Sequence, residues 1–200
     1  MQKITDEKNL FLEGKYVFLE SVSPKHFPHI VGWRNSERVS RYVIQPFRLT
    51  EELEAKWYEK YRREKGHCML VLTAKKQNVP FGTLGYIRYN AAQKICIGTH
   101  HLVGEEAYRG SKEYAEAALL FHDHLFQTLG VEKCYVHVIV ENTKTVNLLK
   151  KIGFQDSSPA RFPECLQMGG KTLLEYVLTA QSYAEHRHLL LQLVDGMEDS

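Results

Sequence analysis

The 200-residue chain predicts a mixed α/β fold, in which one sheet combines parallel and antiparallel strands. Three strand-like runs between residues 68 and 102 are joined by short polar turns, which is typical of an antiparallel meander. A strand–helix–strand crossover then spans residues 95–140, and such a crossover implies that its two strands are parallel. We expect one domain over residues 1–200, because this length suits a single core and no long linker interrupts it.

The first third of the chain predicts one strand and two helices. Residues 16–20 form the strand, and Ser23-Pro24 then begins a helix that runs through Trp33, with proline near its first turn. A second helix is expected from Thr50 to about Lys65. Thr50 is its N-cap, and acidic residues occupy its first turn.

The meander consists of strands at residues 68–74, 81–89 and 94–102, and Gly82 and Gly85 permit a bulge or a close approach in the middle one. A helix follows at residues 112–129, because apolar residues recur there with a helical period, and Gly130 ends it.

The last third begins with a buried strand at residues 131–140. An amphipathic helix at 142–151 follows it and stops at Gly153. Gly169-Gly170 predicts a hairpin turn between strands at 165–168 and 172–178. A helical tail is expected at 181–197. Its apolar stripe packs either on its own domain or on a second subunit, so a homodimer is one outcome; the stripe is Tyr183, Leu190, Leu193, Val194 and Met197.

Composition excludes several classes of protein. A net charge of +2 is too balanced to indicate nucleic-acid binding. No apolar run approaches the ~20 residues that span a bilayer, and the N-terminus has no apolar signal-peptide core, so we expect no membrane association. The four cysteines are far apart, which favours free thiols in a reducing cytoplasm, and no Cys/His cluster has zinc spacing, so no metal is expected.

The turn between the strand ending at Leu102 and the helix beginning at Lys112 is the main candidate for a binding site. A helix start leaves backbone N–H groups without partners, and the helix dipole makes that end positive. Both features suit a phosphate group.

Three segments carry a resemblance to a known family. They are Tyr108-Arg-Gly-Ser-Lys-Glu-Tyr-Ala-Glu-Ala117, the pattern Asn142-x-x-Thr145-x-x-Leu148-x-x-x-Ile152-Gly-Phe154, and Trp33-Arg-Asn-Ser with Thr50-Glu-Glu and Trp57. Together they resemble the GNAT superfamily of acetyl-CoA-dependent N-acetyltransferases, and in particular its branch of ribosomal-protein N-terminal and amino-sugar acetyltransferases. The resemblance implies the acyl-CoA N-acyltransferase fold, in which two central strands splay apart, and acetyl-CoA as co-substrate.

The resemblance also implies where acetyl-CoA binds. The pyrophosphate is expected at the backbone N–H groups of Gly110 to Tyr114, with charge from Arg109 nearby. The pantetheine arm is expected along the strand edge at Leu102 and Val103, and Asn142 is expected to contact the cofactor at the splayed strands. The full set of expected cofactor residues is Leu102, Val103, Arg109, Gly110, Ser111, Lys112, Glu113, Tyr114 and Asn142.

The chain departs from the family pattern at three positions. Lys112 and Tyr114 stand where the family's loop usually has glycine or alanine, and glycine lets backbone approach a phosphate closely. Lys112 either supplies an ammonium to the pyrophosphate or obstructs it. Leu149 stands where the family often has a tyrosine that acts as general acid, so this role is absent, filled by water, or taken by another tyrosine.

Three residues are candidates for the general base that acetyl transfer to an amine requires: His100, His101 and Glu141. Neighbouring residues of a strand face opposite sides, so only one of the two histidines points into the gap between the splayed strands. Alternation groups His101 with Ile97 and Thr99, but a bulge would reverse that facing, and the choice stays open.

The sequence thus predicts a cytoplasmic N-acetyltransferase that moves an acetyl group to a primary amine of a small molecule, such as an amino sugar, or to a protein N-terminus. The acceptor pocket is expected between the two N-terminal helices, including residues 33–42, and the loop 157–164. Two alternatives remain: a degenerate member that binds without transferring acetyl groups, and an acyltransferase that uses a longer acyl-CoA.

Overall fold

The structure, a computed structural model, describes residues 7–196. Nine strands of this part of the chain form the sheet, in the order β1-β2-β3-β4-β5-β6-β9-β7, and β8 pairs with β9 alone. The strands are β1 (Phe11–Glu13), β2 (Val17–Ser21), β3 (Cys68–Ala74), β4 (Val79–Asn90), β5 (Ile95–Val103), β6 (Lys133–Ile139), β7 (Gln155–Asp156), β8 (Gln167–Met168) and β9 (Lys171–Thr179).

Six α-helices accompany the sheet within residues 7–196: α1 (Phe27–Asn35), α2 (Glu37–Ser40), α3 (Glu51–Tyr61), α4 (Lys112–Asp123), α5 (Thr143–Lys151) and α6 (Ala180–Asp195). Short 3-10 turns lie at Pro24–His26, Glu106–Tyr108 and Pro163–Cys165, and a π-helical turn extends α4 at His124–Thr128. None of these helices combines the length and the apolar character that crossing a membrane requires.

The predicted mixed α/β fold class is confirmed. Strands β3, β4 and β5 are antiparallel neighbours, as the meander requires. Strands β5 and β6 are parallel, but they pair only from Ile95–Gly98 to Lys133–Val136. Beyond Gly98 and Val136 the two strands run on without pairing. This is the splay in the middle of the sheet that the resemblance implied.

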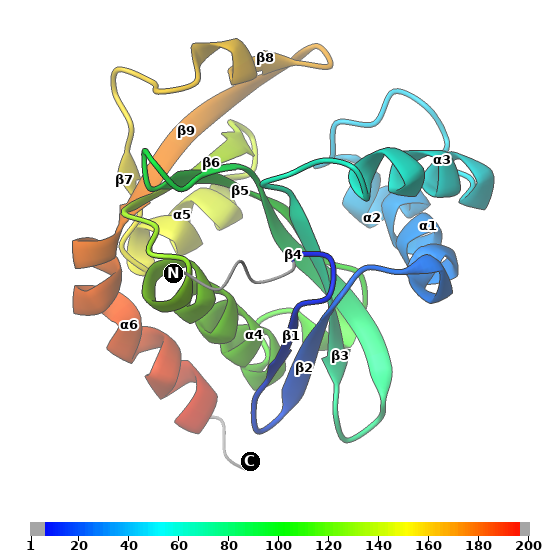
Figure 1. Cartoon of the computed structure of the whole chain (residues 1–200), viewed down its shortest axis with the longest axis horizontal. Helices are drawn as coiled ribbons and strands as arrows, with labels where there is room; N and C mark the ends of the chain where they lie inside the picture. The colour runs from blue at the N-terminus through cyan, green and yellow to red at the C-terminus, as the bar shows by residue number, and fades with distance from the viewer. Residues whose placement is uncertain (1–6, 197–200) are drawn as a thin grey trace.

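The helices cover the two faces of the sheet unequally (Figure 1). One core cluster joins strands β2 to β5 with α4, and a second joins β6 and β9 with α4, α5 and α6. On the opposite face, α1 and α3 pack on β3 around Trp33, Tyr61 and Val71. In Figure 1 the α1–α3 group lies to the right and the β8–β9 hairpin at the top, with the sheet between them.

Several predicted boundaries are corrected. Helix α3 ends at Tyr61 rather than near Lys65, because the chain turns at Gly66 (φ +66°) to enter β3. Helix α4 continues after Asp123 as a π-helical turn, in which the Leu129 N–H donates to His124 O. Gly130 (φ +67°) ends this turn. Cys165 belongs to a 3-10 turn rather than to a strand. Strand β1 was not predicted.

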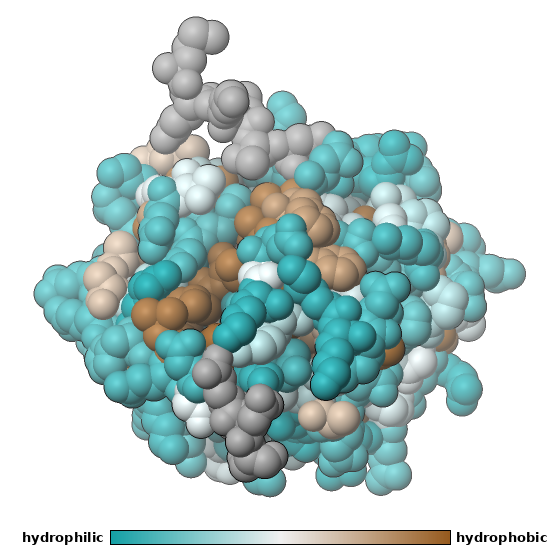
Figure 2. Space-filling model, turned by 90° about the horizontal axis from the view of Figure 1, so that it is seen from below, coloured by the Kyte–Doolittle hydropathy of each residue, from teal (hydrophilic) through white to brown (hydrophobic). Residues whose placement is uncertain are grey.

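The tail helix packs on its own domain. Tyr183, Leu190 and Val194 are buried, and the Tyr183 hydroxyl donates to Asp123 of α4 at 2.9 Å. Arg187 binds both oxygens of the same carboxylate. Leu193 is exposed, and Met197 lies outside the described residues. Seen from below, the surface carries separate hydrophobic areas among hydrophilic side chains (Figure 2). A homodimer stays a prediction.

Candidate active site

A β-bulge in β5 decides where the two candidate histidines point. Leu102 pairs with Thr83 and Thr99 with Gly85, so two residues, His100 and His101, lie opposite one residue of β4. His100 has a φ of +58°, in the left-handed region that side chains other than glycine seldom occupy. Strict alternation along the strand, which grouped His101 with Thr99, is therefore wrong. The extra residue at the bulge shifts every side chain after Thr99 to the other face.

His100 faces the N-terminal helices. Its ring lies edge-on to Trp57 of α3, with 6.0 Å between the ring centroids, and its Nε2 is 2.9 Å from Nε2 of His67. The other ring nitrogen of His67, Nδ1, is 2.7 Å from the Glu64 carboxylate. Burial, together with the charges of His67 and Arg34, lowers the pKa of His100 to about 3, so both rings are neutral at pH 7.

His101 faces the opposite side, toward α4. Its ring contacts Phe121 edge-on, with 5.8 Å between the centroids. The residue is exposed at the surface, while desolvation by the surrounding protein, together with the charge of His122, lowers its pKa to about 3. The structure thus places the two histidines on opposite faces of the sheet, both beside the splay between β5 and β6.

Glu141 and Asn142 lie on the other side of the splay, in the turn after β6. The Asn142 N–H donates to Ile139 O, and the Asn142 side-chain oxygen accepts from the Thr145 N–H at 3.4 Å. Asn142 therefore caps α5. Glu141 is exposed. Within residues 7–196 its carboxylate has no hydrogen-bond or ion-pair partner, whereas His100 and His101 are held by ring contacts.

The loop before α4 offers backbone donors, as the phosphate hypothesis requires. Ser111 is the N-cap, and its hydroxyl accepts from the Tyr114 N–H at 3.2 Å. The Tyr114 N–H, one of the five N–H groups expected to bind a phosphate, therefore already has an acceptor. The Ser111 N–H also has one, because it donates to Tyr108 O. Within residues 7–196, the N–H groups of Gly110, Lys112 and Glu113 have no such partner.

The two side chains that replace the family's glycines have partners outside this loop. The Lys112 ammonium lies 4.5 Å from the centroid of the Tyr16 ring in the segment between β1 and β2. Tyr114 packs against the core, and its burial raises its pKa to about 12. Gly110 has a φ of +71° and open space around it, while Arg109 is exposed. The loop therefore keeps an open backbone despite its unusual sequence.

The edge of β5 at Leu102 and Val103 has no strand partner on the β6 side. Arg38 of α2 reaches this edge, and its Nη2 donates to Val103 O at 3.2 Å and also to Gly104 O. Trp33 of α1 lies flat against Gly104, where a Cβ would come within 2.1 Å of the indole, and its Nε1 donates to Glu105. The N-terminal helices are thereby attached to the end of β5.

Loop 157–164 covers β6 and β9 on the same face as the N-terminal helices. Glu175 of β9 is buried, and it accepts hydrogen bonds from the Arg161 and Phe162 N–H groups and the Ser157 hydroxyl. Burial raises the pKa of Glu175, but these donors outweigh that effect and hold its pKa below the usual range. His137 of β6 lies 3.0 Å from the same carboxylate.

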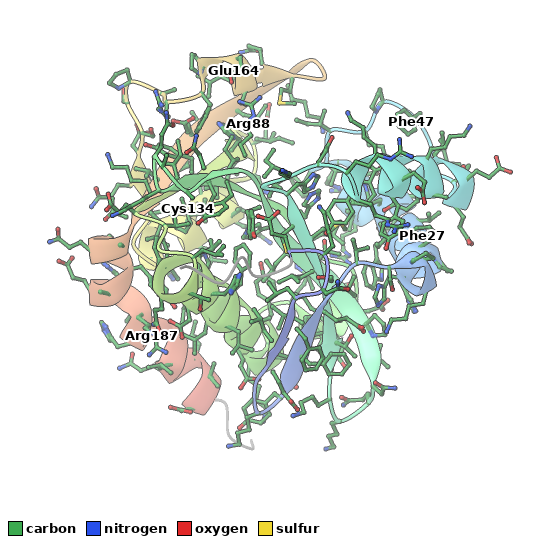
Figure 3. The ribbon with its side chains drawn as sticks, in the orientation of Figure 1. Phe27, Phe47, Arg88, Cys134, Glu164 and Arg187 are labelled. Atoms are coloured by element: carbon green, nitrogen blue, oxygen red, sulfur yellow. The ribbon has the colours of Figure 1, made fainter. Side chains whose placement is uncertain are left out.

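The residue after α2 also contacts β9. Lys171, the first residue of β9, donates to Arg41 O at 2.6 Å. Figure 3 shows Arg88 and Glu164 beside each other at the loop end, where their side chains pair at 2.6 Å. The N-terminal helices and loop 157–164 thus both cover the face on which the acceptor pocket is predicted, and the pocket itself stays a prediction.

Sequence reasoning missed several polar residues of this region. His67 and Glu64 stand beside His100 only because α3 folds back onto β3, and Arg38 reaches β5 across a separation of 65 residues. His137 is a residue that the sequence could have indicated. A histidine in a buried strand needs a hydrogen-bond partner, so its presence there predicts a polar residue beside it. A hollow of about 440 Å³ beside Lys133 and Arg161 lies at the paired end of β6, away from the splay. Across residues 7–196 no three potential metal ligands converge.

Comparison with known proteins places these features in a family. The model of the acetyltransferase (GNAT) domain matches residues 17–155. No curated protein matches the chain closely enough to count as a relative.

Solved structures share the whole fold. A GCN5-related N-acetyltransferase from Brucella melitensis has a TM-score of 0.80 at 17% identity, over 98% of this chain and 90% of that one. FdhC, described as a nucleotide-linked sugar GNAT, has a TM-score of 0.74 at 19% identity, over 93% and 99%. Spermidine N-acetyltransferase from Vibrio cholerae, solved with CoA and spermine, has a TM-score of 0.72 at 17% identity, over 86% and 99%.

Proposed function

Because the chain belongs to the GNAT acetyltransferase family, it is an acetyl-CoA-dependent N-acetyltransferase, and we propose that its acceptor is the primary amine of a small molecule such as an amino sugar, or a protein N-terminus. The observation that carries the proposal is the splay between β5 and β6, with a histidine on each face and a helix start at one end.

The residues present fit acetyl-CoA, whose thioester supplies the activated acetyl group. Three backbone N–H groups, of Gly110, Lys112 and Glu113, would bind the pyrophosphate at the positive end of α4, with Arg109, Ser111 and Tyr114 completing the loop. The β6-facing edge at Leu102 and Val103 would hold the pantetheine arm by strand-like hydrogen bonds. Asn142 would contact the cofactor from the end of β6.

Arg38 has a part in this arrangement, because its guanidinium already bonds the Val103 carbonyl oxygen. An oxygen accepts two hydrogen bonds, so Arg38 leaves one lone pair of Val103 O for the pantetheine amide. A backbone N–H near Leu102 or Val103 would also stabilise the negative charge that develops on the thioester oxygen.

The general base is proposed among His100, His101 and Glu141. An alkyl ammonium has a pKa near ~10, so its deprotonation costs about 4 kcal/mol at neutral pH. The base has to lie on the acceptor side of the sheet. His100 satisfies this condition, because it faces the N-terminal helices and the proposed acceptor pocket. His101 faces α4 and is the better placed of the two to contact the cofactor.

The charge around the proposed pocket bears on the class of acceptor. Two arginines with no carboxylate partner within residues 7–196, Arg38 and Arg161, lie on the segments that border it, whereas Arg41 and Arg88 are paired with Glu37 and Glu164. Repulsion from these guanidinium groups disfavours a polyamine such as the spermine bound by the Vibrio cholerae enzyme. An amino sugar suits this charge better, especially one attached to phosphate, as in the nucleotide-linked sugars named for FdhC.

Ligand-induced stabilisation tests the cofactor part of the proposal. CoA and acetyl-CoA are expected to raise the melting temperature by several degrees at concentrations well above Kd, because a ligand that binds only the folded state stabilises it by mass action. Comparing longer acyl-CoAs in the same scan distinguishes an acetyltransferase from an acyltransferase with a longer donor. An unchanged melting temperature with every CoA would contradict the proposal and revive the degenerate alternative.

Turnover tests the acceptor part. Release of the CoA thiol would be followed with glucosamine, a nucleotide-linked amino sugar, a tripeptide with a free N-terminus, and spermidine. We expect an amino sugar to be acetylated and spermidine to be the poorest acceptor. Faster turnover of spermidine would overturn the charge argument.

A further inference from the structure

Three side chains form a continuous hydrogen-bonded chain from the protein surface to β5. The Glu64 carboxylate, in the turn after α3, lies 2.7 Å from His67 Nδ1, and His67 Nε2 lies 2.9 Å from His100 Nε2. The two rings are nearly coplanar, with 5° between their planes. Glu64 is 38% exposed and the His67 side chain 9% exposed, so the chain runs from solvent into the protein.

The positions of the hydrogens follow from the chemistry of the three groups. A carboxylate only accepts, so the hydrogen between Glu64 and His67 belongs to His67 Nδ1. A neutral imidazole has a single N–H, so His67 Nε2 is an acceptor and His100 Nε2 must donate to it. His100 Nδ1 is then left with a free lone pair. Within residues 7–196 this nitrogen has no hydrogen-bond partner.

The surroundings of His100 keep this tautomer in place. Trp57 lies edge-on to both imidazole rings, and Tyr61 packs edge-on against His67. Gly85 of β4 lies behind the His100 ring, where a Cβ would come within 3.1 Å of Cδ2. The ring is thus wedged between α3 and β4, on the face of the sheet that borders the proposed acceptor pocket.

We propose that Glu64 and His67 are positioning residues that hold His100 in the tautomer with a free Nδ1, and that this nitrogen takes the proton of the acceptor ammonium. This deepens the proposed function and rests on it. The N–H bond of the ammonium breaks, its electron pair stays on the amine nitrogen, and the proton forms a new N–H bond at His100 Nδ1. The positive charge on His100 is balanced through His67 by the Glu64 carboxylate, and the proton leaves to water after product release.

The charged and titratable neighbours act in opposite directions on a positive charge at His100. Arg34 of α1, His101 of β5 and Lys8 of the N-terminal segment all disfavour a charge on His100, and burial adds to their effect in lowering its pKa. Glu64 is the acidic group that opposes them by raising the pKa of His67, while Lys60 pairs with Glu64 at 3.5 Å. Without Glu64, the pair of rings would be a much weaker base.

Kinetics of Glu64→Gln test the proposal. This variant removes the charge of a half-exposed side chain and keeps its size. We expect kcat with an amino sugar to fall by at most roughly tenfold for each unit by which the pKa of the base drops. We also expect the acidic limb of the pH profile to move to lower pH. The acceptor KM should change little. Glu59→Gln, on the exposed face of α3, is the matched control and should behave as the parent enzyme.

A second measurement reads the tautomers without any substrate. Nitrogen-15 NMR of the imidazole rings should show His67 protonated at Nδ1 and His100 at Nε2, and Glu64→Gln should alter the His67 signals. A His100 protonated at Nδ1, or a Glu64→Gln enzyme with the parent pH profile, would overturn the positioning role. Failure of the proposed function is a separate result, since it would show as absence of CoA binding while the tautomers stay as inferred.

Discussion

At the scale of single residues, the candidate site depends on the extra residue in β5. With regular alternation, His100 would face α4 and His101 the N-terminal helices. The bulge at His100 exchanges them, at the cost of a positive φ in a residue that is not glycine. Thr83 helps to hold this conformation, because its hydroxyl donates to His100 O. Backbone strain of this kind is worth ~1–3 kcal/mol and persists at functional sites.

Lys112 gives a residue-scale prediction about cofactor binding. Its ammonium is held over the Tyr16 ring, and its backbone lies in the first turn of α4. We therefore expect Lys112→Met to weaken CoA binding by about fivefold, which is the loss of one partly screened charge interaction worth roughly 1 kcal/mol.

Isothermal titration calorimetry at two salt concentrations measures this effect. The loss should shrink at the higher salt concentration. Lys76→Met, in the exposed turn between β3 and β4, serves as the control. Tighter binding of CoA by Lys112→Met would mean that the lysine obstructs the loop.

At the scale of elements, the start of α4 is fixed by a contact that has no counterpart in local sequence. Buried Glu116 accepts hydrogen bonds from the N–H groups of Lys15, Tyr16 and Val17 at 2.7 to 3.0 Å. Gly14 makes room for the carboxylate, since a Cβ there would lie 2.5 Å from Glu116 Cδ. The β1–β2 turn and the proposed cofactor helix are thereby joined across about 100 residues of sequence.

Glu116→Ala is expected to lower the free energy of unfolding by at least about 3 kcal/mol, because it leaves three buried or partly buried N–H groups without an acceptor. Urea unfolding followed by circular dichroism measures this change. Glu113→Ala, one turn earlier in the same helix, should cost less than about 1 kcal/mol, since it removes only a favourable charge near the helix start. If the two substitutions lowered the free energy of unfolding equally, the negative charge at the helix start, and not the buried contact of Glu116, would account for the stabilisation.

At the scale of the whole molecule, the two faces of the sheet are covered by different helices. Helices α4, α5 and α6 close one face around two core clusters, while α1–α3 and loop 157–164 border the other on either side of the splay. Figure 3 shows Cys134 of β6 near the middle of the molecule. It pairs with Cys96 within the paired segment of β5 and β6, and both thiols are buried.

Buried histidines on the closed face make global stability depend on pH. Burial lowers the pKa of His122 and of His124 to about 4, whereas an unfolded histidine titrates at 6.5. Between these values the unfolded chain binds more protons, so stability is complete above pH 6.5 and falls as the pH drops toward 4. Each histidine accounts for about 2 kcal/mol between pH 7.5 and pH 5.

Urea titrations at pH 7.5, 6 and 5 check this dependence. His122→Gln should flatten the pH dependence of stability, and His188→Gln, at an exposed position, should not. A parent protein whose stability does not change over this range would contradict the prediction.

The sequence by itself determined the order of the longer helices and strands, the antiparallel meander, the parallel crossover, and the helix starts at Thr50 and Lys112. These features depend on periodicity, capping residues and turn chemistry, which act over a few neighbouring residues. It also indicated the family and the two candidate histidines, because short motifs and residue types can be recognised without knowing the tertiary structure. Tertiary structure alone decided which histidine faces the N-terminal helices, that Glu64 and His67 stand beside His100, and that Arg38 reaches Val103. A bulge and long-range contacts are decided by how distant elements pack, and no local pattern in a single sequence records that packing.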